Sequence, residues 1–219
     1  NRSGTPVLRW VMIQGKTMLV KNLVVSLCER KEIKNFIEQH HYSKSINGVK
    51  SSFCFSVKHQ DVLVGGLIYG EMSTTAWKKF GEKECEVLEL RRLVLLDECP
   101  RNSESRVIAK SLQWIRKNVK HVKRVVSYAD PNHGHTGVIY RATNFTLHSM
   151  SAKDYGFKDK ETGKIHHSRA LRTKYKGDFK PFVKALREKL SRGGLEKIVL
   201  QPKYCFLYEF KRKDDAEGN

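Results

Sequence analysis

Residues 85–100 read CEVLELRRLVLLDECP, the most apolar strand-like run of the chain. We expect this run to form a central strand of a sheet. Apolar and charged side chains alternate as far as Arg91, but Arg92 then falls where an apolar side chain is due. One extra residue at Arg91-Arg92 restores the alternation of the two faces. The stretch therefore predicts a central strand with a β-bulge.

The segments after this strand alternate between helix and strand. Residues 103–119 space their apolar side chains by four, three and four positions, as an amphipathic helix does: Ile108, Leu112, Ile115 and Val119. VKRVVSYADP (122–131) reads as a second central strand, and HGHTGVIYRATNF (133–145) as a loop that opens a further helix. This order predicts an α/β fold with parallel strands and a functional crevice beyond their carboxyl ends, near Arg91 and Asp130.

The N-terminal segments supply further elements. Apolar runs predict strands at 7–13 and 19–25. Ser26, followed three positions later by Glu29, is a capping-box signature, which predicts a helix from there to about His40.

The remaining segments are compatible with one domain over residues 1–219. Residues 52–57 and 62–69 predict a hairpin, because a polar tip separates two strand-like runs. Residues 153–176 are basic and lack a clear period, so we expect a loop or insertion there. A last helix is expected at 182–190, and a closing strand at YCFLYEF, 204–210.

The composition points to a polyanionic partner and an intracellular setting. Lys and Arg total 42 against 23 Asp and Glu, a net charge of +19. Such an excess favours nucleic acid as the partner, although a ribosome-associated or simply soluble basic protein is the alternative. Five widely spaced cysteines fit neither a disulfide framework nor a zinc knuckle, and no apolar run has the length of a membrane span.

The densest group of reactive side chains lies at the end of the second central strand and in the loop after it: Tyr128, Asp130, His133, His135, Tyr140 and Arg141. Their position at the expected crevice favours a functional site. The alternative is structural, because Asp130-Pro131 can simply begin a turn and His135 or Thr136 can cap the next helix.

Two other groups accompany it. His41 and Tyr42 follow the first helix, and His41 joined by Asp130 could bind a metal or act as an acid–base partner; capping of the helix is the alternative. Glu89, Arg91 and Arg92 lie on the central strand. The arginines can grip phosphate and Glu89 can serve as a general base if its pKa is raised, or all three can be surface charge or an internal ion pair.

The order of elements resembles the acetyltransferase (GNAT) superfamily, a mixed central sheet flanked by helices. In that superfamily the bulge exposes a backbone N–H to the acyl group, and the next loop binds the cofactor pyrophosphate. The matching positions here are Arg91-Arg92 and the loop Arg101–Arg106. Neither glycine of the superfamily loop is present, but Ser103 and Ser105 keep N–H groups and hydroxyls for a phosphate. The resemblance implies acetyl-CoA or a related acyl donor.

HHYS at 40–43, ELRRL at 89–93, SYADP at 127–131 and GHTGVIYRATNF at 134–145 resemble the Mom family of phage proteins more closely. This resemblance implies a DNA adenine-modifying transferase that makes N6-carbamoylmethyladenine and shields phage DNA from restriction. It implies His41, Asp130 and Tyr140 as active-site residues, with iron held by His41 and Asp130. It places Ser103, Ser105 and Ser111 near the cofactor.

The same resemblance implies double-stranded DNA as the partner, in the host cytoplasm, with no membrane association and a homodimer as the expected assembly. An adenine N6 must leave the duplex to be modified. We expect Tyr42, Tyr128 and Arg141 to contact the DNA, with Tyr69 as a further ring on which a base can stack.

Two other functions fit the residues. An acyl-CoA-dependent N-acetyltransferase acting on a protein or small amine would bind CoA and ignore DNA. A non-catalytic basic DNA-binding module would bind DNA without changing it.

Overall fold

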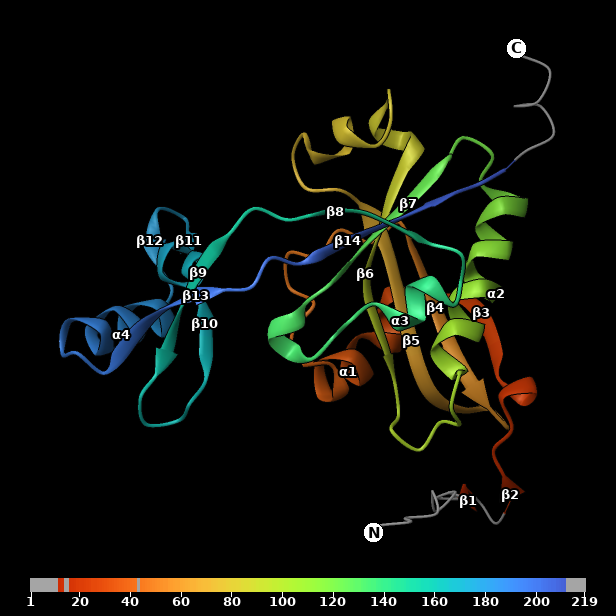
Figure 1. Cartoon of the computed structure of the whole chain (residues 1–219). Helices are drawn as coiled ribbons and strands as arrows, with labels where there is room; N and C mark the ends of the chain where they lie inside the picture. Colours follow the sequence, from red (N-terminus) through yellow and green to blue (C-terminus); the bar gives the residue numbers. More distant parts are fainter. Residues whose placement is uncertain (1–11, 14–15, 43, 212–219) are drawn as a thin grey trace, which may run out of the picture. The chain divides into compact units, whose positions relative to one another are not determined.

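The computed structural model describes residues 12–13, 16–42 and 44–211 (Figure 1). The chain divides into two compact units: the first comprises residues 1–128, 137–148 and 206–219, and the second comprises 129–136 and 149–205. The chain passes between the units four times, so the segments of the second unit are inserted into the first. The expectation of a single domain stays a prediction.

A seven-stranded sheet has the order β3-β4-β5-β6-β7-β14-β8. Its strands are β3 (Val24–Cys28), β4 (Phe53–His59), β5 (Val62–Glu71), β6 (Val87–Leu95), β7 (Arg124–Ala129), β14 (Tyr204–Glu209) and β8 (Thr146–Met150). The strand predicted to be central, β6, is the fourth of the seven. It pairs antiparallel with β5 and parallel with β7. The expected α/β fold with a mixed central sheet is confirmed.

The predicted bulge is present in β6. Tyr69 of β5 pairs with Leu90 and Ile68 pairs with Arg92, which leaves Arg91 as the extra residue. On the other side of β6, the parallel ladder with β7 runs only from Val87 to Glu89. The two strands therefore share a short ladder at their start, as a crevice beyond their carboxyl ends requires.

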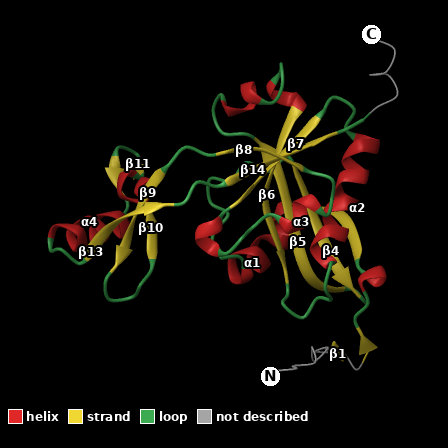
Figure 2. Ribbon diagram, in the orientation of Figure 1, coloured by secondary structure: helices red, strands yellow, loops and turns green. Residues whose placement is uncertain are grey.

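Helices cover both faces of this sheet (Figure 2). Cys54 and Ile68 pack in one core with α1 (Arg30–His40). Their neighbours Phe55 and Tyr69 contact Trp114 and Ser111 of α2 (Ser103–Asn118). Because successive residues of a strand point to opposite faces, α1 and α2 lie on opposite faces of the sheet.

The N-terminal predictions need correction. Residues 7–11 of the first expected strand lie outside the described residues; Met12–Ile13 and Lys16–Thr17 form the two-residue strands β1 and β2. The run expected as a strand at 19–25 instead contains a 3-10 turn, Val20–Asn22, before β3. Ser26 belongs to β3, where it pairs with Ser56, and the capping box is formed by Glu29 and Glu32. The helix thus begins three residues later than a box at Ser26 would place it.

The second unit contains an ordered sheet where the sequence suggested a loop. Its strands are β9 (Asp154–Asp159), β10 (Ile165–His167) and β13 (Leu195–Leu200), in the order β10-β9-β13. Asp159 accepts hydrogen bonds from the N–H groups of residues 161 and 162 and so closes the β9–β10 turn. Side chains of β9, β13, η5 (Ser168–Arg172) and α4 (Pro181–Ser191) form its core: Phe157, Leu171, Leu186 and Leu195. Strands of three to six residues give too short a pattern to be recognised in sequence.

Short elements complete the described chain, among them the 3-10 turns η2 (Ala76–Lys79) and η3 (Glu84–Glu86) before β6. The strands β11 (Lys174–Tyr175) and β12 (Asp178–Phe179) form a two-stranded hairpin before α4. The helix α3 (Val138–Arg141) follows β7 through the 3-10 turn Pro131–His133. Within the residues described, no helix has the length and apolar character needed to cross a membrane.

Gly70 of β5 lies where the bulged region passes another segment of backbone. A Cβ atom at this residue would be 2.1 Å from the Lys50 carbonyl oxygen and 3.2 Å from Cδ of Arg91. We therefore expect Gly70→Ala to lower the free energy of unfolding by about 1–3 kcal/mol, measured by urea denaturation. Glu71→Ala is the control, since it removes only an exposed ion pair with Lys50, worth about 1 kcal/mol or less. Unchanged stability of Gly70→Ala would contradict the close approach.

Candidate active site

A group of polar side chains gathers where β6 and β7 cease to pair. The Ser127 hydroxyl of β7 donates to the Leu90 carbonyl of β6 at 3.3 Å, one residue beyond the backbone ladder. The same hydroxyl hydrogen-bonds the Tyr140 phenol of α3. Tyr140 is buried, and its ring packs against Phe145 and Phe206. Tyr140, a predicted catalytic residue, is thus held beside the end of the β6–β7 ladder.

Burial raises the pKa of Tyr140, and the hydrogen bond with Ser127 offsets only part of this effect. The nearby side chains of Tyr42 and Glu89 raise this pKa further. The phenol therefore stays protonated at neutral pH, which suits it to donate a hydrogen bond rather than to act as a base.

His41 and Tyr42 reach this group from the end of α1. His41 is buried and its ring lies 4.2 Å from that of Tyr42, centroid to centroid. Tyr42 is 50% exposed, so its ring is open to a ligand. Arg30, at the start of α1, donates to the carbonyls of Ile46 and Val49, both at 2.6 Å, and so holds the loop that follows Tyr42.

The two arginines at the bulge have different surroundings. Arg91 forms an ion pair with Glu89 at 3.1 Å and donates to the Glu71 carbonyl at 2.7 Å and to Ser73. These contacts use the guanidinium of Arg91 to stabilise the fold. Arg92 donates to the carbonyls of Arg91 and Ser45, and within the described chain its buried Nε has no hydrogen-bond partner. Burial lowers the pKa of Arg92. Arg92 is therefore the arginine with capacity left for an anion.

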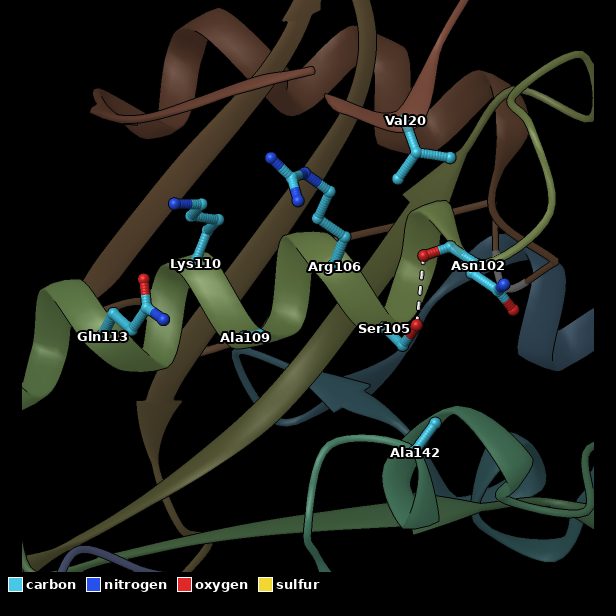
Figure 3. Close-up of a pocket in the computed structure, with 8 residues that line it drawn as sticks. All are labelled: Val20, Asn102, Ser105, Arg106, Ala109, Lys110, Gln113 and Ala142. Atoms are coloured by element: carbon cyan, nitrogen blue, oxygen red, sulfur yellow. Dashed lines mark hydrogen bonds between the residues drawn. The ribbon is translucent and has the colours of Figure 1, made fainter. Parts of the chain in front are cut away.

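A cavity of about 400 Å³ runs along α2 in the first unit (Figure 3). Arg106 and Lys110 project from the same side of α2, toward the segment that carries Val20. Its polar lining also includes Ser105, whose hydroxyl donates to the Asn102 carbonyl at 3.0 Å. The Arg106 Nε is buried and lacks a partner among the residues that can be described. The eight lining residues include no carboxylate: Val20, Asn102, Ser105, Arg106, Ala109, Lys110, Gln113 and Ala142.

The other residues expected near a cofactor lie elsewhere. Ser103 is fully buried and donates to the Pro100 carbonyl at 2.6 Å. Ser111 is buried beneath the sheet, 2.7 Å from the hydroxyl of Tyr69. Tyr69 is itself fully buried, which excludes it as a ring for a base in this structure and corrects that expectation. Arg101 is exposed in the turn before α2.

The residues expected to contact DNA differ in exposure. Tyr128 is half-buried in β7, whereas Tyr42 and Arg141 are exposed. The Arg141 guanidinium lies over the Phe206 ring, 5.2 Å from its centroid. Exposure leaves Tyr42 and Arg141 accessible, so their contact with DNA stays a prediction.

Asp130 belongs to the second unit and is held there by two partners. Its carboxylate accepts from Lys203 Nζ at 2.9 Å and from the backbone N–H and side-chain amide of Asn132 at 3.0 and 2.8 Å. Burial alone would raise the pKa of Asp130, but these hydrogen bonds outweigh it and leave the pKa below its ordinary value. Asp130 is therefore ionised at neutral pH.

The donor set does not fit a preformed iron site. Over residues 12–13, 16–42 and 44–211, no three His, Cys, Asp or Glu side chains come together as a metal-binding group. The carboxylate oxygens of Asp130 already accept hydrogen bonds from Lys203 and Asn132. The expectation of iron at His41 and Asp130 gains no support from this arrangement.

Several residues of these sites were missed from sequence. Ser127 and Lys203 are ordinary strand and loop residues by pattern, and Asn132 reads as part of an Asp-Pro turn. The positions of Arg106 and Lys110 could have been predicted from the sequence. Residues 102, 106 and 110 are spaced by four and so share one face of the predicted helix.

The role of Lys203 can be tested by titration. Lys203→Met removes a strong donor from a mostly buried carboxylate, so we expect the pKa of Asp130 to rise. The measurement is an NMR pH titration of the carboxyl carbon. The pKa of Asp130 is lower in the folded state than in the unfolded chain. The stability that its carboxylate confers is therefore present at neutral pH and is lost as the pH falls through the folded-state pKa.

Lys184→Met is the matched control. Lys184 pairs with Asp178 at 2.6 Å in the same unit, and its hydrogen bond lowers the pKa of Asp178. The control should raise the pKa of Asp178 and leave that of Asp130 unchanged. A titration of Asp130 that is the same in Lys203→Met and in the unaltered protein would exclude the ion pair.

Solved structures with similar backbones are acetyltransferases. A Bacillus subtilis acetyltransferase in complex with CoA has a TM-score of 0.49 and 12% identity, over 86% of this chain and 99% of that chain. A spermidine N-acetyltransferase from Vibrio cholerae, in complex with CoA and spermine, has a TM-score of 0.47 and 11% identity, over 86% and 96% of the two chains.

Sequence comparison gives a narrower assignment. Methylcarbamoylase mom of Escherichia phage Mu is 48% identical over 58 residues, 26% of this chain and 24% of the phage Mu protein. The match thus spans about a quarter of that relative. The model of the Mom protein family matches residues 22–217, nearly the whole chain. This chain belongs to the Mom protein family.

Proposed function

We propose that this protein is a DNA-modifying enzyme that converts adenine in double-stranded DNA to N6-carbamoylmethyladenine and so protects phage DNA from restriction in the host cytoplasm. Membership of the Mom family supports DNA modification as the class of reaction, and the name of the phage Mu relative, a methylcarbamoylase, supports transfer of a small carbamoyl-containing group. The observation that carries the proposal is the group formed by Tyr42, Glu89, Arg92 and Tyr140 around the end of the short β6–β7 ladder.

The half-exposed ring of Tyr42 provides a surface for an adenine that has left the duplex. An extruded base loses its stacking in the helix, and an aromatic side chain restores part of it. Tyr42 lies within electrostatic reach of both Tyr140 and Arg92. A base stacked there would bring its N6 amine to the polar group, while Arg92 can bind an adjacent anion.

Attack by N6 on the methylene carbon of a carbamoylmethyl donor forms the N6–C bond, breaks the bond from that carbon to the leaving group, which departs with the electron pair, and releases one proton from N6. The amine is a weak nucleophile because its lone pair is delocalised into the ring, so the site must accept the proton and stabilise the departing group. We assign the carboxylate of Glu89 as the nearby acceptor and the protonated phenol of Tyr140 as the hydrogen-bond donor. Asp130, a further predicted active-site residue, lies in the second unit, where Lys203 keeps its carboxylate ionised.

The cavity along α2 is our candidate for the phosphate-bearing end of the group donor. Acetyl-CoA itself would transfer an acetyl group and give N6-acetyladenine, so the donor proposed here is a CoA-like molecule that carries the carbamoylmethyl group. Arg106 and Lys110 provide two cations, and the lining contains no carboxylate to repel an anion. Ser105 lies on the first turn of a sixteen-residue helix, where the helix dipole also favours negative charge. Of the three serines expected near the cofactor, this arrangement favours Ser105.

Tyr140→Phe tests the reaction. The change removes one hydroxyl and retains the ring that packs on Phe145 and Phe206, so the fold should persist. Plasmid DNA from expressing cells is digested to nucleosides and analysed by mass spectrometry. We expect the unaltered protein to give a heavier deoxyadenosine and Tyr140→Phe to reduce its amount about a hundredfold or more.

Tyr208→Phe is the control for Tyr140→Phe, because Tyr208 is a ring of the same aromatic group, packed on Phe145 and Phe210. It should leave the modified nucleoside unchanged. Unmodified nucleosides from soluble unaltered protein would reject the proposed reaction, and full modification by Tyr140→Phe would reject the role of the phenol.

The donor site is tested by calorimetry with CoA. Replacing Arg106 and Lys110 with Gln removes both cations from the cavity. Each charged hydrogen bond lost costs about 1–3 kcal/mol of binding free energy, so we expect the affinity for CoA to fall about tenfold or more. Lys117→Gln, which removes an exposed charge at the far end of α2, should have no effect. Equal CoA affinity in all variants would move the donor away from this cavity.

A further inference from the structure

The second unit carries a dense group of cations on three consecutive elements. Residues 169–187 span η5, the β11–β12 hairpin and most of α4, and they contain seven Lys and Arg against one acid, Asp178. All but Lys180, which is half-buried, are exposed: Arg169, Arg172, Lys174, Lys176, Lys180, Lys184 and Arg187. We call this set the η5–α4 basic face.

Side-chain contacts bring these elements onto one surface. The Phe179 ring of β12 lies between two cations, Lys174 at 5.1 Å and Arg187 at 4.5 Å from its centroid. Arg187 of α4 also donates to the Leu171 carbonyl of η5 at 3.2 Å. Hairpin, helix and η5 are therefore in mutual contact, and their charges belong to a single face.

The local backbone presents the cations outward. Lys176 and Gly177 both have positive φ, 50° and 85°, which makes a tight hairpin turn with Lys176 at its tip. The hairpin leads directly into the eleven-residue α4, whose first turn therefore belongs to the same face. Phe182 on that turn is 54% exposed.

We propose that the η5–α4 basic face binds the phosphate backbone of double-stranded DNA, separately from the group that reacts with the base. The inference extends the proposed function, in that the DNA is the substrate of the modification. Exposed lysines and arginines neutralise successive phosphates and release counterions, which gives affinity without reading sequence. A single carboxylate, already paired with Lys184, leaves the face strongly positive.

Duplex DNA fits this face better than an acidic protein does. The face is made of Lys and Arg side chains on exposed, continuous elements, and the ring of Phe182 is exposed among them. Protein interfaces tend instead to have an apolar core and to exclude lysine from it. A protein that reacts with one base also needs a second contact with the duplex, one that does not depend on the flanking sequence.

The test is the salt dependence of binding of a fluorescent DNA duplex, measured by anisotropy with the full chain. Lys174, Lys176 and Lys184 are replaced together by Gln. If all three contact phosphate, the slope of log affinity against log salt should fall by about three and affinity should drop about tenfold or more near physiological salt. Replacing the same three with Arg keeps the charge and should retain binding.

The control removes an equal charge from the first unit. Arg116, Lys117 and Lys120 are exposed cations at the C-terminal end of α2, and their replacement by Gln should change the slope far less. Equal losses in both triple variants would overturn the inference, because net charge alone would then govern binding. Unchanged DNA binding with weakened binding of RNA or of an acidic peptide would overturn it too.

Failure of this inference can be told apart from failure of the proposed function. Nucleosides from cells expressing the unaltered protein report on the reaction alone. Modified deoxyadenosine with no change of DNA binding in the Gln variant would reject the basic face and keep the function. Unmodified DNA with binding that depends on the face would reject the function and keep the basic face.

Discussion

The extra residue in β6 determines how the rest of the first unit is arranged. A one-residue bulge reverses the faces of the residues that follow it, and the two arginines at the bulge meet different surroundings. Arg91 is held by Glu89, the Glu71 carbonyl and Ser73, which fixes the bulge itself. Arg92 receives only carbonyl partners. Burial disfavours the charge of Arg92, and Glu89, the carboxylate that acts on it, is already paired with Arg91; an anionic ligand would offset this cost.

Sequence reasoning succeeded where one element carries its own pattern. The break in alternation at Arg92 was enough to locate the bulge, and the spacing of apolar residues was enough to locate α2 to within one residue. The carboxyl ends of β6 and β7 then indicated where reactive groups should gather. Tyr140, Glu89 and Arg92 were proposed as site residues in this way, because a strand end or a bulge constrains them locally, and their roles stay predictions.

The residues that were missed depend on contacts between distant parts of the chain. Lys203 reaches Asp130 across 73 positions, and Ser127 bridges to Leu90 across 37. No periodicity encodes such pairs. The capping box shows the same limit. The motif fits Ser26 with Glu29 and also Glu29 with Glu32, and only the pairing of Ser26 with Ser56 in β3 excludes the first pair. The short strands of the second unit likewise depend on partners rather than on their own length.

The two units differ in the surroundings of their charged side chains. In the first unit, carboxylate, phenol and guanidinium lie in one partly buried group, where each charge strongly affects its neighbours. In the second unit, one carboxylate is held ionised by Lys203, while the cations of the η5–α4 basic face are exposed and well separated from it in sequence. At about 0.1 M salt, interactions between exposed charges are largely screened beyond about 10 Å, whereas interactions between buried charges are screened much less. Changes in salt should therefore act on attachment to DNA and leave the chemistry of the reacting group nearly unaffected.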